Sequence, residues 1–407
     1  MSKQQTVFDH MTAAPHRSLF LFGAMQGVVA VLWWIFDLSG RYGFVGTATQ
    51  WTVAPTWVHA FLMVYGFFPF FIFGFLFTTY PNWMNGEKVR IREYVATGLL
   101  MAVGVVLVYA GLLTHKLLVI LGVELMLTGW SVAVYVLFRI LLTAQAQDKR
   151  HARVTSAALL MGWFGVAAYL FWLVSEHFML LDFARQAGLW LFLLPIVLTV
   201  SHRMIPFFSS RVLDNYEMVR PFWMLWLMLA CIVIHACLQF LGLAAYLWLV
   251  DFPLMACAAY LSYRWELQRS FQVSLLAVLH ISFAWFSIAM LLYGLQSLIY
   301  FVSGDLLFGL APLHALGIGF FSGMILAMAS RVTLGHSGRP LELDRAIWLL
   351  FLGFQATAVI RIFADLVPAV AAVFYLLAAL VWLGCFGMWA FRFVPIYWRA
   401  RVDGKPG

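Results

Sequence analysis

Long apolar runs separated by short polar loops make up most of this sequence. A transmembrane helix needs about 20 mostly apolar residues. Twelve runs meet this length, and they cover residues 18–38, 57–80, 93–113, 117–142, 154–175, 187–206, 221–241, 244–263, 271–300, 307–330, 346–367 and 370–397. Since the loops leave no room for a soluble domain, the pattern predicts one all-α domain over residues 1–407, a polytopic membrane bundle of about twelve helices.

The composition supports a membrane protein and excludes a soluble globular one. Of the 407 residues, only 10% are charged and 64% are hydrophobic, whereas soluble domains average roughly 25% charged residues. The net charge of +8 is spread over short loops rather than gathered in a patch. This distribution argues against a nucleic-acid partner and leaves membrane lipid as the main one.

The positive charges predict the orientation of the bundle. Twelve spans place both termini on the same side of the membrane. On that side lie 21 of the 25 lysine and arginine residues, with three on the opposite side and Arg361 inside a span. Because cytoplasmic loops carry an excess of Lys and Arg, we expect both termini in the cytoplasm.

The histidines near the spans fall into two groups by expected depth. The outer group is His59, His314 and His235, with Arg361 at a similar depth; the inner group is His202, His280 and His336, with Arg17, Arg203 and Arg331 close by. Ionisable groups inside a span are costly and therefore candidates for function. Opposed imidazoles with nearby guanidinium groups suit a b-type haem, in which histidine binds the iron and arginine pairs with the propionates. The alternative for each histidine is a hydrogen-bonded contact between helices.

A second candidate site lies in the seventh run. Met224, Met228, Cys231 and His235 are spaced to share one helical face. Thioether, thiol and imidazole ligands suit Cu(I), with Cys231 and His235 the best pair. The alternative is ordinary packing of a soft, apolar face.

Small residues and carboxylates add further candidates. Gly317, Gly319 and Gly323 leave a shallow strip on the tenth span, suited either to close helix packing or to a flat macrocycle. Glu124 and Glu176 are possible proton-handling carboxylates near span ends. Three further spans contain Pro69, Pro195 and Pro253, each of which removes a backbone donor.

Several motifs resemble those of one known family. Residues 314–320 read HALGIGF and residues 324–340 read MILAMASRVTLGHSGRP, and together they closely resemble the signature of the NnrS family. PHR at 15–17, HAFLM at 59–63, YPNW at 80–83 and RMIPFF at 203–208 are similar to its other motifs. The similarity extends over nearly the whole chain.

The resemblance implies a bacterial inner-membrane protein that contains haem and copper. The family is associated with the nitric oxide response, denitrification and protection from nitrosative stress. On this basis His59, His202, His280, His314 and His336 are the candidate ligands. The chain departs from the family where many members have HAHEM and residues 59–63 read HAFLM, so the resemblance does not extend to a metal site that needs the second histidine and the carboxylate.

Three functions compete on these observations. The first is a membrane protein that carries haem b, with or without copper, and binds or converts nitric oxide; turnover would make it an oxidoreductase that needs an electron donor such as quinol. The second is a transporter of a small solute or metal, for which twelve spans with proline-broken helices are typical. The third is a redox subunit with an electron-transfer haem. No His-His pair occurs in the chain, which disfavours a haem-copper oxidase subunit.

Overall fold

The computed structural model describes residues 6–404, and every regular element within them is a helix. Within residues 6–404, eleven helices are long and apolar enough to cross a membrane. Large apolar side chains project outward from them, such as Phe391 at 85% exposure and Leu142 at 77%. Such surfaces are stable only against lipid. The prediction of an all-α, multi-pass membrane protein is confirmed.

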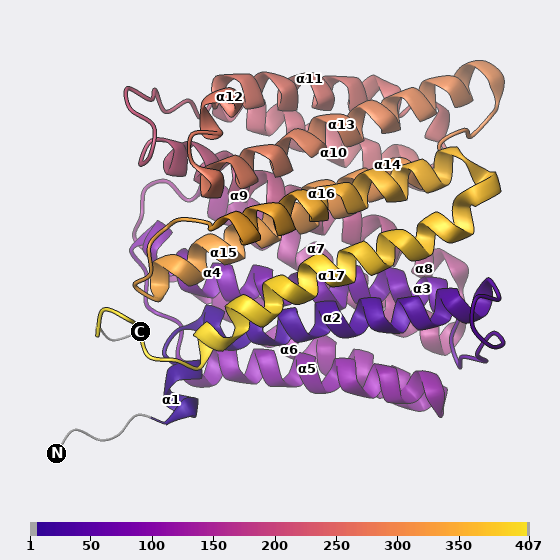
Figure 1. Cartoon of the computed structure of the whole chain (residues 1–407), viewed down its shortest axis with the longest axis horizontal. Helices are drawn as coiled ribbons and strands as arrows, with labels where there is room; N and C mark the ends of the chain where they lie inside the picture. Colours follow the sequence, from indigo (N-terminus) through magenta and orange to yellow (C-terminus); the bar gives the residue numbers. More distant parts are fainter. Residues whose placement is uncertain (1–5, 405–407) are drawn as a thin grey trace. The chain divides into compact units, whose positions relative to one another are not determined.

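The helices, labelled in Figure 1, fall into two compact units by their contacts. Unit 1 comprises the described residues up to Gly188, Ala329–Leu341 and those from Gly387 onward; unit 2 comprises Leu189–Met328 and Glu342–Phe386. These ranges cut three helices, so that η2, α15 and α17 contribute residues to both units. The single-domain prediction stays a prediction.

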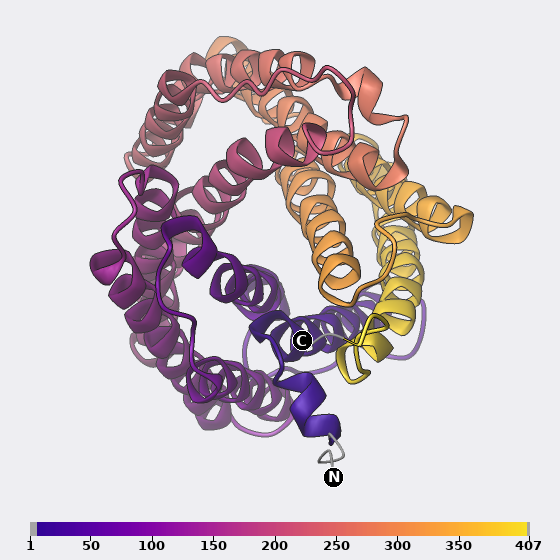
Figure 2. The same cartoon turned by 90° about the vertical axis from the view of Figure 1, so that its left-hand side faces the viewer.

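The first half of the chain supplies most of unit 1. Its helices are α1 (Val7–Met11), α2 (Pro15–Arg41), α3 (Pro55–Phe61), η1 (Leu62–Phe67), α4 (Phe68–Met84), α5 (Ile91–Leu113), α6 (Lys116–Thr143), α7 (Arg150–Ser175) and α8 (Phe178–Gln186). Consecutive helices α5 and α6 form a tightly packed hairpin, visible in Figures 1 and 2.

The remaining elements begin with η2 (Ala187–Leu193). They continue through α9 (Leu194–Ser209), α10 (Phe222–Phe240), η3 (Ala244–Tyr246), α11 (Trp248–Arg264), α12 (Leu267–Ser270), α13 (Ser274–Ser303), α14 (Ala311–His314), η4 (Ala315–Ser322), α15 (Gly323–His336), α16 (Arg345–Leu366), η5 (Pro368–Val370) and α17 (Ala371–Tyr397). Within unit 2, α11 packs against α10 and α13.

One predicted span, 244–263, is shorter than expected. Helix α11 has 17 residues, the lower end of the length that crosses a membrane. At its start, the Trp248 amide donates to Ser297 Oγ of α13 at 3.1 Å. Just beyond its end, Trp265 Nε1 donates to the Val219 carbonyl, ahead of α10, at 2.9 Å. Helix α11 therefore runs between the same two ends as its neighbours α10 and α13, and the twelfth crossing stays a prediction.

The two ends of the described chain meet in unit 1. Arg17 Nη1 donates to the carbonyl oxygens of His10 and Arg399, at 3.0 Å each. The same guanidinium therefore holds the segment before α2 and the segment after α17. This contact agrees with the prediction that both termini lie on one side of the membrane.

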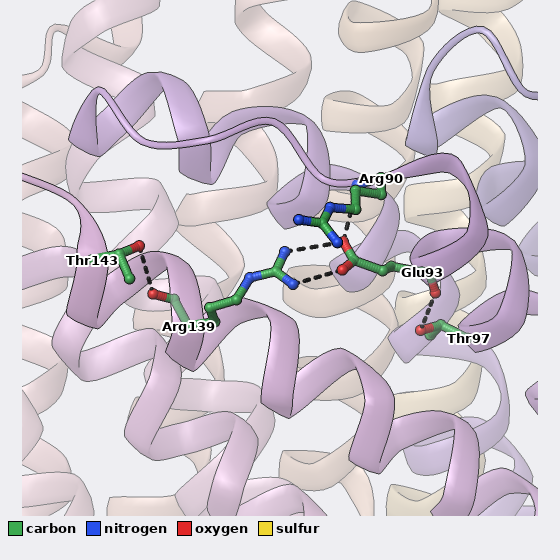
Figure 3. Close-up of polar contacts among 5 residues, drawn as sticks. All are labelled: Arg90, Glu93, Thr97, Arg139 and Thr143. Atoms are coloured by element: carbon green, nitrogen blue, oxygen red, sulfur yellow. Dashed lines mark hydrogen bonds and ion pairs between the residues drawn. The ribbon is translucent and has the colours of Figure 1, made fainter.

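An ion pair joins the start of α5 to the last turns of α6 (Figure 3). Arg139 Nη1 and Nη2 donate to the two carboxylate oxygens of Glu93, at 2.6 and 3.1 Å. Glu93 Oε2 also accepts the Arg90 amide at 3.0 Å, which caps the first turn of α5. Since Arg139 and Glu93 are 22% and 12% exposed, they satisfy each other near the end of two apolar helices.

Three π-helical segments, η1, η2 and η4, interrupt the long helices. Two of them end just before a proline, Pro69 in α4 and Pro195 in α9. A proline has no N–H for the carbonyl one turn earlier, which favours a local change of hydrogen-bond register. In η4, which has no proline, Ser322 Oγ donates to the Gly317 carbonyl at 2.8 Å, five residues back.

Candidate functional site

Each π-helical segment adjoins one of the candidate histidines. His59 precedes η1 by three residues, and His314 directly precedes η4. Trp190 of η2 stacks on His235, with 3.4 Å between ring centroids. Since π-helical turns are rare and occur frequently at functional sites, this coincidence directs attention to these three positions.

His314 belongs to a polar cluster in unit 2, which we call the Asp365 cluster: His314, Arg361, Asp365 and Tyr375. Arg361 Nη1 lies 2.7 Å from Asp365 Oδ2, and the Tyr375 hydroxyl donates to Asp365 Oδ1 at 2.8 Å. The Arg361 guanidinium also lies over the Tyr375 ring, 4.2 Å from its centroid. His314 Nδ1 is 4.0 Å from Asp365 Oδ2. Arg361 and His314, predicted to share a depth, are therefore neighbours.

The hydrogen bond of His314 determines which ring nitrogen can bind a metal. Nδ1 lies 2.9 Å from the Leu310 carbonyl oxygen. Because a carbonyl only accepts, Nδ1 carries the hydrogen and Nε2 carries the lone pair. Histidine ligands of metals typically have their other nitrogen held in this way. The His314 side chain is 19% exposed, so it lies at the edge of the packed interior.

His59 occupies a different environment, in unit 1. Its ring stacks on Trp34 with 4.1 Å between centroids and 10° between planes. The Arg41 guanidinium also lies over the Trp34 ring, 5.0 Å from its centroid. Arg41 forms an ion pair with Asp37 at 2.5 Å. Since His59 lies in unit 1 and His314 in unit 2, their predicted pairing around one haem stays a prediction.

The inner group of histidines is divided between the units. His336, Arg17 and Arg331 lie in unit 1, whereas His202, His280 and Arg203 lie in unit 2. Within unit 2, His280 Nε2 lies 3.0 Å from Ser209 Oγ. Ser209 is seven residues beyond His202 on α9, which is about 10 Å along the helix axis. His202 is fully buried, and its ring lies 5.4 Å from that of Phe222.

The partner of His336 in unit 1 is a residue that the sequence did not single out. The His16 and His336 rings lie 4.8 Å apart, and His16 is 1% exposed. His16 Nδ1 is 3.4 Å from Thr78 Oγ1 of α4. The PHR motif at 15–17 was the only sequence signal for His16, because the fold, not the spacing, brings residues 16 and 336 together.

Positive charges gather around these two imidazoles in what we call the basic cluster: His16, Arg17, His336, Arg339 and Arg401. Arg17 and Arg401 lie within electrostatic range of His336. Burial and the nearby Arg399 lower the pKa of Arg339. Asp403 accepts from Arg401 at 2.9 and 2.7 Å and raises the pKa of that guanidinium. The cluster therefore suits an anionic group such as a carboxylate or phosphate.

The soft face of α10 is buried, as packing would require. Met224, Met228, Cys231 and His235 are all at most 6% exposed. His235 Nδ1 is 2.7 Å from Asp251 Oδ1 of α11, so that nitrogen faces a carboxylate rather than Cys231. Among residues 6–404, no group of three or more His, Cys, Asp and Glu side chains is placed to hold a metal ion.

The glycine strip of the tenth span divides between two environments. A Cβ at Gly319 would lie 2.4 Å from the Trp285 ring of α13, and one at Gly323 would lie 2.8 Å from Ser282 Oγ. A Cβ at Gly317 would have no heavy atom within 4 Å. Close packing on α13 therefore accounts for Gly319 and Gly323, and only Gly317 faces open space.

One protein family matches nearly the whole chain. The model of one family, described as NnrS protein, matches residues 10–401. No curated protein matches the chain.

Proposed function

The chain belongs to the NnrS family, and from this membership together with the Asp365 cluster we propose a haem-bearing protein that binds nitric oxide in the bacterial inner membrane. The observation that carries the proposal is the contact of His314 Nδ1 with the Leu310 carbonyl oxygen, at 2.9 Å. That contact occupies Nδ1 and leaves the lone pair on Nε2, the form that ligates haem iron.

The residues of the Asp365 cluster fit the group in three ways. His314 would supply the axial imidazole. Arg361, already oriented by Asp365 and stacked on Tyr375, would pair with a propionate. Gly317, three residues beyond His314, leaves space on the same segment for a flat ring. When bound, ferrous haem supplies a site of high affinity for nitric oxide.

A second set of residues in unit 1 suits the same cofactor chemistry. His16 and His336 offer imidazoles, and Arg17 and Arg339 offer cations for propionates. His59 lies apart from them, because it stacks on Trp34, which is about 27 Å further along α2 than His16. Copper is the other cofactor that the family resemblance implies. His235 fits it poorly because Asp251 lies at Nδ1 and Gln239 lies 3.5 Å from Nε2. The arginines around His16 and His336 likewise disfavour a metal cation there.

The proposed location follows from the arrangement of charge. Arg17, Arg139 and Arg401 all lie at the end of unit 1 where the two termini meet. Positive ends of this kind face the cytoplasm in an inner-membrane protein. Turnover of nitric oxide, rather than binding alone, would also require an electron donor such as quinol.

The test is the haem content of three purified proteins. We expect the wild type to contain haem b and His314→Ala to lose most of it, because the axial ligand is removed. The matched control is His177→Ala, at an exposed histidine just before α8. Equal haem content in the wild type, His314→Ala and His177→Ala would overturn His314 as a ligand. A wild type without haem, made in haem-replete cells, would overturn the proposal.

A transporter is the second candidate, and one observation favours it. His235 and Asp251 form a fully buried pair within membrane-crossing helices, and buried ionisable pairs of this kind occur in proton-coupled transporters. Uptake assays in vesicles would distinguish it from a protein that only binds nitric oxide.

A further inference from the structure

His235 and Asp251 are the most completely buried ionisable pair in the described part of unit 2. Both side chains are 0% exposed, and His235 Nδ1 lies 2.7 Å from Asp251 Oδ1. Nothing in the proposed haem chemistry uses them. Glu124 and Glu176 were predicted from the sequence as possible proton-handling carboxylates, but both are exposed. Glu176 also forms an ion pair with Lys116 at 2.7 Å. The buried carboxylate is Asp251.

The surroundings of the pair are apolar and aromatic. The Trp190 ring of η2 stacks on His235, with centroids 3.4 Å apart and 26° between planes. Tyr293 of α13 meets the same imidazole edge-on at 5.7 Å. The other titratable neighbours are two free thiols: Cys231, within electrostatic range of Asp251, and Cys257, within range of Cys231. A lone charge there would be costly.

The number of protons on the pair follows from this cost. A neutral imidazole beside an ionised carboxylate would leave one buried negative charge. With one more proton, on either partner, the pair has no net charge. The neutral form is therefore the stable one, and Asp251 Oδ2, buried and without a hydrogen-bond partner, is an acceptor that a proton can occupy.

One polar side chain lies between the pair and the end of α10. Gln239 lies one turn beyond His235, its Nε2 is 3.5 Å from His235 Nε2, and it is half-buried. Helix α10 ends one residue later, at Phe240. The Gln239 amide is therefore a polar group through which a proton could reach the buried imidazole from the end of α10.

We propose that His235 and Asp251 form an intramembrane proton-binding site that holds one proton and exchanges it with water past Gln239. The proton enters and leaves at the imidazole nitrogen beside Gln239 and is shared with the Asp251 carboxylate. The site is independent of haem. It would supply a proton inside the membrane to whichever reaction or transport step the protein performs.

The test is pH-difference infrared spectroscopy of the full-length protein in detergent. We expect raising the pH to remove bands of the bound proton, on the carboxyl or on the imidazolium, from the wild type. These bands should be absent from Asp251→Asn and His235→Gln, and present in the control Glu124→Gln, at an exposed carboxylate of α6. Thiol and phenol groups absorb elsewhere, so Cys231, Cys257 and Tyr293 do not mimic them.

Several outcomes would overturn the proposal. One is an identical difference spectrum in wild type and Asp251→Asn; another is a wild type that shows no exchangeable proton at the pair by hydrogen–deuterium exchange. Asn keeps the shape of Asp and can still bond to His235, and gel filtration in detergent establishes that each variant is folded. Gln239→Leu should leave the bands in place and slow their exchange; unchanged exchange would contradict the route past Gln239.

Discussion

At the residue scale, Asp365 pairs with Arg361 and lies beside His314. It forms an ion pair with Arg361 at 2.7 Å, accepts a hydrogen bond from Tyr375 at 2.8 Å, and lies 4.0 Å from His314. The sequence identifies His314 and Arg361 because each is an ionisable residue in an apolar run. It does not reveal Asp365 as their common partner, since that depends on how α14 and α16 pack.

Removing the cation from the Asp365 cluster should be costly. Arg361 and Asp365 are only 13% and 6% exposed, so Arg361→Gln leaves a nearly buried carboxylate without its ion-pair partner. We expect a loss of about 3–5 kcal/mol in the free energy of unfolding, measured by thermal unfolding in detergent. Replacing both partners, Arg361→Gln with Asp365→Asn, should recover part of this stability. A double variant as unstable as the sum of the two single ones would show that the pair is not coupled.

At the element scale, the structure agrees closely with the predicted helices where hydropathy alone decides. The run 93–113 corresponds to Ile91–Leu113, and 117–142 corresponds to Lys116–Thr143. The π-helical segments were not predicted, because a change of hydrogen-bond register leaves the apolar pattern unchanged. Pro69 and Pro195 gave the only local hint, and η4 has no such signal.

The glycines of η4 provide a matched test of close packing. Gly319→Ala would place a methyl group 2.4 Å from the Trp285 ring, whereas Gly317→Ala would meet nothing within 4 Å. We expect Gly319→Ala to destabilise the protein by about 1–3 kcal/mol through overpacking, and Gly317→Ala to be neutral or stabilising because alanine favours helix. Thermal unfolding compares the two directly. Equal effects would show that α13 does not pack tightly on η4.

At the scale of the whole molecule, sequence and structure agree on which helix ends share a side. Arg17 ties the residues before α2 to those after α17, and the Glu93–Arg139 pair lies at the ends of α5 and α6 that the charge pattern assigns to the cytoplasm. What the sequence left open is the partner of each histidine. His16 and His336 are 320 residues apart in the chain and 4.8 Å apart in space, and no local pattern encodes such a contact.

Orientation is testable with inserted epitopes. A tag placed directly after Gly404 should be protected from protease in intact spheroplasts, because the positive ends face the cytoplasm. A tag beside His177, at the exposed start of α8, should be cleaved under the same conditions. Cleavage of the Gly404 tag alone would invert the orientation, and cleavage of both would contradict the seven crossings predicted between the two tags.

The account rests most directly on a haem that binds nitric oxide. The decisive measurement is the absorption spectrum of the purified wild type when oxidised, when reduced with dithionite and after exposure to nitric oxide. We predict the bands of a b-type haem in the reduced protein and a shift of the Soret band on addition of the gas. A haem spectrum that the gas leaves unchanged, or a protein without haem bands, would contradict the account.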